Sequence, residues 1–434
     1  MMLATFLGSY LGARRRFSSL TETSLREFQD SRARQQVQRA YTQGSYWRTH
    51  WQGCNLADWR SLPTTDKAAM MADFSHYNTV GVDKDQALKT ALGAETSRDF
   101  RPTIPGTDIT VGLSSGTTGH RGLFLASPNE RAAWAGAILA RALPGGLWSA
   151  PTNQGWRVSL FLRAASNLYD TVRGRFVKFY FHDLLEPIEQ SVANLNKETP
   201  EVLLGPPSLL ARLAVKRKAG RLRIQPLCVY SVAEVLEPQE AERLAEAFGL
   251  ERIHQIYQAT EGLLAVSCAA GGLHLQEDIV TVQTESLGDG RFVPILTDLW
   301  RTTQPILRYR LNDVLRLSET PCPCGSIFRT IEAIEGRQDD VCEFGGQSVY
   351  PDTLRRAILL ASNEIVEYRL VQQRPNQLTL YLEPTPGADT KALEQEVCAS
   401  LNRLLPQPEL EIRFGLPTEE PVTRKRRRVQ RCWE

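Results

Sequence analysis

The chain has 434 residues, which is long enough for two or three domains with a large apolar core. Hydrophobic residues make up 42%, charged residues 23% and aromatic residues 8%, as in an ordinary soluble protein. The formal net charge is only +2, so the whole molecule offers no electrostatic case for binding nucleic acid or a membrane.

The two ends of the chain differ from this average. The apolar segment 1–12 is too short to cross a bilayer, and arginines 14–16 follow it, which is the wrong order for a secretory signal. We expect a packing or frayed N-terminal segment. The last residues, 424–431, are strongly basic. Eight cysteines in a long chain without an export signal predict free thiols or metal ligands, and a cytoplasmic protein.

Helical and strand patterns alternate along most of the chain. Residues 20–43 have apolar positions at helical spacing and predict a helix. Turn residues at 62–67 predict the start of a short helix, with Thr65 or Asp66 as its N-cap. From about 109 to 310 the alternation predicts a layered α/β domain. The expected strands are 159–162, 176–181, 202–204 and 227–230, and the expected helices are 128–142, 186–196, 207–218 and 237–248.

The end of the chain has a different pattern. Residues 335–340 are charged, contain a glycine and suit a hinge. We therefore expect a large α/β domain over 1–336 and a small, mobile α+β domain over 337–434, which can close over a reaction and reopen. The elements expected in the small domain are helix 352–362, strand 365–373, turn 374–376, strand 377–383, helix 388–404 and strand 409–414.

One loop of small, hydroxylated and basic residues suits a polyphosphate. An expected strand over 108–113 leads into it. Its glycines allow a close backbone approach to a ligand, its N–H and hydroxyl groups can bind an anion, and a basic residue adds positive charge. Alone, the stretch fits a solvated turn equally well. The residues are Ser114, Ser115, Gly116, Thr117, Thr118, Gly119, His120 and Arg121.

Four further segments follow this loop: 257–262 (Tyr-Gln-Ala-Thr-Glu-Gly), 308–313 (Arg-Tyr-Arg-Leu-Asn-Asp), 336–340 and 423–429. Together the five resemble an adenylate-forming enzyme, in the branch that contains phenylacetate–CoA ligase and enzymes related to coenzyme F390 synthetase. The resemblance extends from about residue 20 to 430. It implies an N-terminal adenylation domain, a small C-terminal domain with a catalytic lysine, and ATP and Mg²⁺ as cofactors.

The resemblance also implies roles for the residues that match. Residues 114–119 would hold the β,γ-phosphates of ATP. Thr260 would lie near the α-phosphate, and Glu261 would bind Mg²⁺, a cation that prefers carboxylate and phosphate oxygens. Asp313 would accept hydrogen bonds from the ribose hydroxyls. Arg337 resembles the nucleotide-contacting arginine, and Asp339 the hinge residue.

Adenine would pack between Tyr257 and the turn that contains Ala233 and Glu234, although valine precedes this turn where the family has glycine. Lys425 resembles the catalytic lysine, which would bridge the substrate carboxylate and the α-phosphate. Arg424 stands before it where the family has glycine. Outside this context the basic run would suit a solvated tail or a nucleic-acid patch.

The implied reaction is adenylation of a carboxylic acid, which we expect to be aromatic. Residues 161–169 and 205–208 mix aliphatic, aromatic and small polar groups, which suits an aromatic or medium-sized acid. The acyl group would then pass to CoA or to the phosphopantetheine of an acyl carrier protein, along a path lined by Gly345 and Gly346. The alternative is adenylation of a phenolic hydroxyl, as in coenzyme F390 synthetase. We expect neither a nucleic-acid partner nor a membrane.

A possible zinc site comprises Cys268, His274, Cys322 and Cys324. Three sulfurs and one imidazole make a tetrahedral zinc-ligand set, although Cys-x-Cys is tighter than the commoner spacing. The resemblance adds that some members of the branch hold zinc in the matching region. The alternative is a group of buried thiols, with the histidine belonging to a strand over 273–276.

Overall fold

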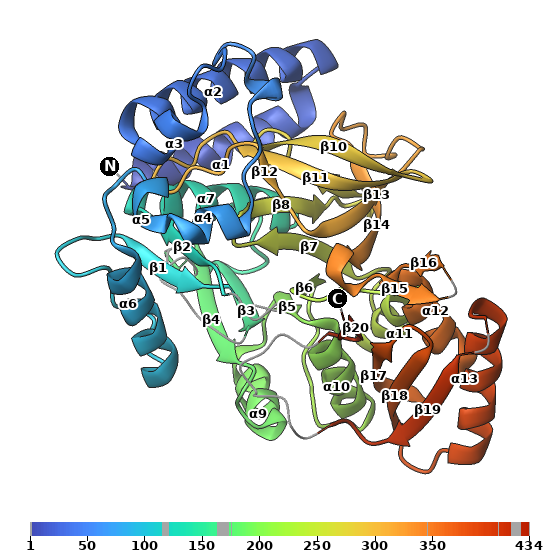
Figure 1. The fold of residues 1–434 in the computed structure, drawn as a ribbon. Helices are drawn as coiled ribbons and strands as arrows, with labels where there is room; N and C mark the ends of the chain where they lie inside the picture. The colour runs from blue at the N-terminus through green and yellow to red at the C-terminus, as the bar shows by residue number, and fades with distance from the viewer. Residues whose placement is uncertain are drawn as a thin grey trace.

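One large mixed sheet organises most of the chain in the computed structural model (Figure 1). Its parallel half runs in the order β4 (Val177–Asp183), β3 (Trp156–Leu162), β5 (Val202–Gly205), β6 (Cys228–Val232) and β7 (His254–Ala259). The structure describes residues 2–114, 121–162, 173–174, 176–344, 346–406, 408–417 and 427–433.

Helices cover both faces of this parallel half, and its inner strands β3, β5 and β6 are accordingly mostly apolar and buried. On one face, Phe161, Leu203 and Val229 pack against three helices. These are α9 (Ile188–Glu198), α10 (Pro207–Lys218) and α11 (Pro238–Phe248). All three agree with the sequence prediction to within two residues at each end.

The opposite face is covered by α7 (Pro128–Ala142) and α1 (Met2–Ser19). A Cβ at Gly136 would lie 2.4 Å from the Phe6 carbonyl oxygen, so the glycine permits the close approach of these two helices. The N-terminal segment is therefore helical through the arginines that follow it, and is longer than the packing segment expected over 1–12. Among the described residues, no helix is long and apolar enough to span a bilayer.

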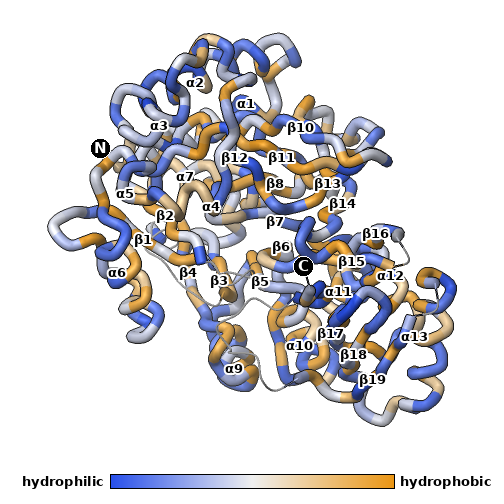
Figure 2. The backbone as a smooth tube through the Cα atoms, in the orientation of Figure 1, coloured by the Kyte–Doolittle hydropathy of each residue, from blue (hydrophilic) through white to orange (hydrophobic). Residues whose placement is uncertain are grey.

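The other half of the sheet is antiparallel and continues from β7 in the order β8 (Gly262–Ser267), β9 (Leu273–Leu275), β14 (Thr330–Arg337), β13 (Asp313–Leu317), β11 (Arg291–Asp298) and β10 (Val280–Gly288), with β12 (Tyr309–Arg310) on β11. The helices α2 (Glu22–Gln43) and α3 (Ser45–His50) contribute to a shared core that contains Trp47, Trp51 and Trp59. In Figure 2, β8 and β11 are mainly orange and therefore apolar.

A small unit flanks the predicted phosphate loop. The strands β1 (Thr110–Leu113) and β2 (Leu123–Ala126) form an antiparallel hairpin, and α6 (Lys84–Ser97) packs against it. Two short helices, α4 (Lys67–Ala72) and α5 (Phe74–Tyr77), precede α6. Asp66 caps α4 by accepting the Ala69 N–H at 2.8 Å, which confirms one of the two predicted N-caps.

The C-terminal residues have their own sheet and core. The sheet order is β19 (Glu409–Phe414), β18 (Gln377–Pro384), β17 (Ile365–Arg374) and β20 (Val429–Arg431). The helices α12 (Pro351–Ala361) and α13 (Thr390–Leu404) complete it, after the hairpin of β15 (Cys342–Phe344) and β16 (Gln347–Val349). The sequence predicted these helices and β17 to β19, but missed β20. Figure 1 shows this unit beside α10 and α11.

Candidate functional site

The residues predicted to contact a nucleotide lie along one pocket at the carboxyl ends of β6 and β7. The order of the parallel strands reverses between β3 and β5. In open α/β sheets, ligands bind outside the carboxyl ends of the strands, near the point where the order reverses. The described predicted residues that line the pocket are Ser114, Ala233, Glu234, Tyr257, Thr260, Glu261, Asp313, Arg337 and Asp339. The predicted residues Ser115–Gly119, Gly345 and Lys425 lie outside the described part of the chain.

Tyr257, Asp313 and Arg337 form one connected group on the wall of this pocket. The Tyr257 hydroxyl donates to Asp313 Oδ2, and Arg337 Nε lies 3.7 Å from Asp313 Oδ1. The register of β13 and β14 places Asp313 directly opposite Arg337. Burial raises the pKa of Tyr257 well above its ordinary value, and the neighbouring Asp313 carboxylate raises it further, so the phenol stays a hydrogen-bond donor.

The turn after β6 holds the other two residues predicted to border adenine. Ala233 has a φ of 67°, in the left-handed region where a side chain is strained, and such strain is concentrated at functional sites. Glu234 Oε2 accepts the Ser208 N–H at 3.3 Å. Burial raises the pKa of Glu234, while Arg428 opposes that rise. The turn is therefore anchored to the first turn of α10.

Glu261 lies at the end of β7 with its carboxylate held in place. Thr260 Oγ1 donates to Glu261 Oε2 at 2.9 Å, and Arg301 Nη1 donates to the Thr260 carbonyl oxygen at 2.8 Å. Tyr309 is 1% exposed, and its hydroxyl has no hydrogen-bond partner among the described residues. Burial, and next the Glu261 carboxylate, raise the pKa of Tyr309. A carboxylate that is fixed by its neighbours and lines the pocket fits a hydrated Mg²⁺ ion, which binds oxygen ligands.

Lys67 lines the same pocket and was not singled out by the sequence analysis. Its Nζ donates to Ser114 Oγ at 3.2 Å, at the entrance to the predicted phosphate loop. Burial lowers the pKa of Lys67; Glu261 raises it, whereas Arg337, Arg121 and Arg427 lower it further. The sequence marked this helix start only through its N-cap, because a single lysine after a cap has no motif of its own.

Two arginines join Lys67 and Arg337 in a group of positive charges. Arg121 Nε donates to the Ser114 carbonyl oxygen at 3.1 Å, and its Nη1 donates to Glu95 at 2.6 Å. Part of the positive charge expected from Arg121 is therefore neutralised. Arg427 Nη1 donates to Asp340 at 2.8 Å, but its Nε and Nη2 are buried without a partner among the described residues. We call the set Lys67, Arg121, Arg337 and Arg427 the cationic cluster.

The predicted hinge adjoins this cluster. Asn312 Nδ2 donates to Asp339 Oδ2 at 2.6 Å, and the Gln338 N–H donates to the Asn312 carbonyl oxygen at 2.9 Å. Burial raises the pKa of Asp340 to about 6, while the neighbouring Arg427 lowers it. Gly346, expected beside a thiol path, has a φ of 83° and does not line the pocket.

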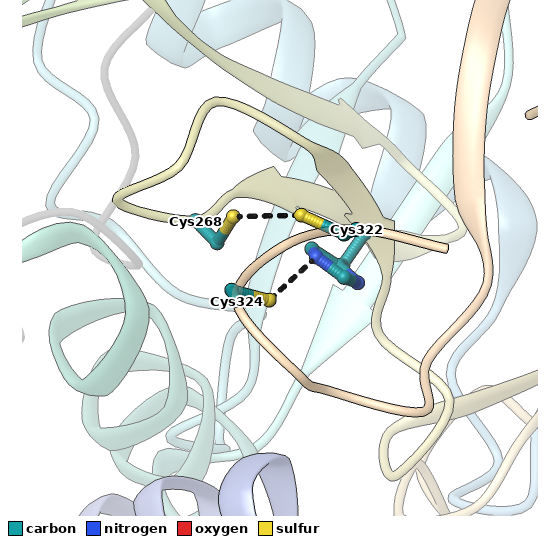
Figure 3. A group of neighbouring side chains, drawn as sticks. Cys268, Cys322 and Cys324 are labelled. Carbon is teal, nitrogen blue, oxygen red and sulfur yellow. Dashed lines mark hydrogen bonds between the residues drawn. The ribbon is translucent and has the colours of Figure 1, made fainter. Parts of the chain in front are cut away.

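The four predicted zinc ligands lie together away from the pocket. Their donor atoms are all within 4.8 Å of one another. Cys268 follows β8, His274 belongs to β9, and Cys322 and Cys324 lie between β13 and β14. Figure 3 shows the three thiols converging, with the Cys268 and Cys322 sulfurs 3.5 Å apart.

The contacts around this cluster suit a metal. His274 Nδ1 lies 2.7 Å from the Phe328 carbonyl oxygen, which fixes the imidazole and directs Nε2 toward Cys324 Sγ, 3.2 Å away. Such a second contact typically orients a histidine ligand. A Cβ at Gly272 would lie 2.6 Å from Cys322 Sγ, so the glycine leaves room for the sulfur. The donor set fits four-coordinate zinc.

No protein-family model matches the chain. It is 24% identical to the protein CapK of Staphylococcus aureus over 243 residues, which are 55% of this chain and 52% of CapK. It is 31% identical to the phenylacetate-coenzyme A ligase of Thermus thermophilus over 206 residues, which are 44% of this chain and 46% of that protein. The chain therefore spans about half the length of the curated relatives it matches.

The fold is similar to solved structures of 2-hydroxyisobutyryl-CoA ligase. The structure of that protein in the postadenylation state with 2-HIB-AMP gives a TM-score of 0.74 at 20% identity, covering 95% of this chain and 90% of the other. Its structure in the thioesterification state with 2-HIB-AMP and CoA gives 0.60 at 21% identity, covering 96% and 92%. At these identities the similarity shows the fold.

Proposed function

We propose that the chain is an adenylate-forming enzyme of a phenylacetate–CoA ligase-like branch, which activates a carboxylic acid with ATP and transfers the acyl group to CoA. A carboxylate oxygen of the acid attacks the α-phosphorus of ATP, and pyrophosphate leaves. The sulfur of the thiol then attacks the acyl carbon, AMP leaves with the carboxylate oxygen, and the thiol proton passes to solvent.

The observation that supports this proposal best is the cationic cluster. Four positive side chains, Lys67, Arg121, Arg337 and Arg427, lie close enough for three of them to lower the pKa of the fourth. Like charges in a partly buried site repel one another, and two buried Arg427 nitrogens have no partner among the described residues to compensate for their lost hydration. A triphosphate would remove both costs, because its oxygens accept charge-assisted hydrogen bonds from lysine and arginine.

The residues of the pocket would divide the binding of ATP between them. Asp313 would accept from the ribose hydroxyls while Tyr257 and Arg337 hold it in place. Ala233 and Glu234 would border adenine. Ser114 and the five residues after it, with Lys67, would hold the β,γ-phosphates. Mg²⁺ would be held by Glu261 and would neutralise phosphate charge.

Lys425 would supply the positive charge at the reacting carboxylate and α-phosphate. It lies two residues before Arg427, which lines the pocket, and this placement supports the assignment. We also propose that residues 1–336 and 337–434 are separate domains with Asp339 at the hinge. The separate core of the C-terminal residues, which includes Leu370, Leu380 and Val397, supports that division.

An aromatic acid remains our proposal, because α7 offers Trp134 and β3 offers Leu160 and Leu162 along the same pocket. A carrier-protein phosphopantetheine is the alternative acceptor to CoA. Adenylation of a phenolic hydroxyl would use the same ATP-side residues and is the alternative reaction.

We further propose that Cys268, His274, Cys322 and Cys324 hold a structural zinc ion. The ion would join the loop after β8 to the long connection between β13 and β14. All four donors are protein side chains, as in closed structural sites, and the cluster does not line the pocket. The zinc would therefore stabilise the antiparallel half of the sheet without taking part in the reaction.

A panel of carboxylic acids in an ATP–pyrophosphate exchange assay tests the proposal directly. We expect exchange that depends on both Mg²⁺ and the acid, followed by thioester formation when CoA is added. A protein that exchanges pyrophosphate with phenols and not with acids would carry out the alternative reaction. The absence of exchange with every acid and phenol would refute adenylation.

A further inference from the structure

The first turn of α11 receives two buried arginines from the C-terminal residues. This helix belongs to the part of the chain that carries the pocket, and its first turn presents Glu237 and Glu240. Acidic side chains are favourable at a helix N-terminus, where the backbone N–H groups give a partial positive charge. Each carboxylate nevertheless forms an ion pair with an arginine more than one hundred residues away. Glu237 pairs with Arg355, and Glu240 pairs with Arg428.

Arg428 is divided between two carboxylates that belong to different parts of the molecule. Its Nη1 and Nη2 each lie 2.9 Å from an oxygen of Glu240, which is a bidentate contact. Its Nε donates to Glu367 of β17 at 2.8 Å. The side chains of Arg428 and Glu240 are both only 12% exposed. The guanidinium therefore joins α11 to the C-terminal sheet in a planar geometry that lysine cannot reproduce.

A second contact lies next to the first. Arg355 of α12 donates from Nε to Glu237 Oε1 at 2.5 Å and from Nη2 to the Ile334 carbonyl oxygen at 3.1 Å. Both side chains of this pair are almost fully buried. We call the four residues Glu237, Glu240, Arg355 and Arg428 the α11 contact. Removal of one member would leave its buried partner with fewer compensating contacts, so each contact is sensitive to a single substitution.

The sequence position of Arg428 connects the α11 contact to the reaction. Lys425 precedes it by three residues, and three residues span at most about 10 Å of extended chain. The Arg428 carbonyl oxygen also accepts the Leu370 N–H at 2.7 Å, next to the pairing of β20 with β17. From Arg428 onward, the chain is thus fixed to α11 by a side chain and to β17 by its backbone.

We propose that the Glu240–Arg428 pair is a positioning contact that presents Lys425 to the pocket during adenylation and must open for the later thioester step. This inference rests on the proposed function. It is supported by the higher TM-score with 2-hydroxyisobutyryl-CoA ligase in the postadenylation state, 0.74, than in the thioesterification state, 0.60. The pair restrains the position of the C-terminal sheet relative to α11.

Glu240→Gln tests the proposal with little disturbance elsewhere, because Arg428 keeps Glu367 as a partner. We expect the rate of ATP–pyrophosphate exchange to fall about tenfold, as for the loss of a coupled buried pair. Single-turnover transfer from a synthetic acyl-adenylate to CoA should stay the same or become faster. Glu240→Asp keeps the charge and should recover part of the exchange rate.

Glu242→Gln is the matched control, since Glu242 is exposed on the same helix and loses the same charge. It should leave both half-reactions unchanged. Equal losses in the two half-reactions of Glu240→Gln would indicate a structural role and overturn the proposal, as would two unchanged half-reactions.

Small-angle X-ray scattering separates this inference from the proposed function, because it needs no acid substrate. Glu240→Gln should change the scattering profile relative to the wild type, and Glu242→Gln should not. If the wild type exchanges no pyrophosphate with any acid, the proposed function fails. Independently of that result, an unchanged scattering profile for Glu240→Gln would show that the pair does not hold the C-terminal sheet on α11, and would overturn this inference.

Discussion

The cationic cluster and the α11 contact both place arginines near carboxylates in partly or fully buried positions. They differ in how many of the arginine nitrogens have hydrogen-bond partners. In the α11 contact, Arg428 makes four hydrogen bonds of 2.8 to 3.3 Å to Glu240 and Glu367. In the cationic cluster, Arg427 makes one ion pair and keeps two buried nitrogens without a described partner. The two arginines are adjacent in the sequence.

This difference distinguishes a contact whose charges are compensated within the chain from a site that we propose to bind an anionic ligand. Arg428 is compensated from within the chain, so its pKa is raised well above the ordinary value in spite of burial. Lys67 is not compensated in this way, and burial together with its positive neighbours lowers its pKa. A buried polar group without a partner is costly, so the unsatisfied charges point to an anion supplied from outside.

The largest effect is expected for Lys425→Ala. If Lys425 stabilises the charge that develops during adenylation, its loss should lower the exchange rate by about 10³-fold, the upper range for removal of one such donor. ATP binding should change little, because the cationic cluster and Asp313 remain. Pyrophosphate exchange gives the rate, and calorimetric titration with ATP gives the affinity. Normal exchange would remove Lys425 from the reaction.

The Cys/His cluster extends the comparison, because we propose that it too binds a ligand from outside the chain. Purified protein should contain one zinc ion, measured by elemental analysis. Cys322→Ser should lose the zinc and lower the melting temperature by about 5–10 °C, as expected for a few kcal/mol in a domain of this size. Cys54→Ser, at an exposed position outside the cluster, is the control. A zinc-free protein that melts at the same temperature with either variant would refute the site.

Lys67→Met should weaken ATP binding by about 30-fold, since a hydrogen bond to a charged group contributes roughly 2 kcal/mol. Lys216 is a lysine that forms an ion pair with Glu189 on the surface. Lys216→Met is therefore a control that removes the same charge at an exposed pair, where an ion pair contributes little. Equal ATP affinity in the wild type and in Lys67→Met would exclude Lys67 from the phosphate site.

The lowered pKa of Lys67 adds a pH dependence with a defined sign. The ammonium group loses its proton at a lower pH than an ordinary lysine, so kcat/KM for ATP should fall on the alkaline side below pH 10.5. Lys67→Arg keeps the charge at alkaline pH and should shift this fall upward. An alkaline limb that is identical in both proteins would belong to another group.

The sequence predicted elements whose signals are local. Pro128 and Pro207 stand at the first turns of α7 and α10, and the Asp66 cap sets the start of α4. It did not predict β20, because the residues before it are basic and its pairing with Leu370 comes from a strand about sixty residues earlier. Lys67 is separated from Ser114 by 47 residues, so only the tertiary fold brings them together.

The candidate site also has features that the sequence predicted and features that only the fold shows. The resemblance supplied the order of Thr260, Glu261 and Asp313 along the chain, and the structure lines one pocket with them. The distinction between Arg427 and Arg428 could not be made from a run of basic residues. It depends on Asp340, Glu240 and Glu367, which the fold brings next to the two arginines.

The smallest effect is expected for Tyr257→Phe, which removes one hydrogen bond to Asp313 from the wall of the pocket. Arg337 remains beside Asp313, so the carboxylate keeps a positive neighbour. The loss should weaken ATP binding about fivefold, the equivalent of about 1 kcal/mol, measured by calorimetric titration. Tyr230→Phe removes a similar buried hydrogen bond, to the Ala142 carbonyl oxygen at 3.0 Å, from a residue that does not line the pocket. It should lower the free energy of unfolding and leave ATP affinity unchanged. If both variants lose affinity equally, Tyr257 acts through general stability rather than by holding Asp313 for the ribose.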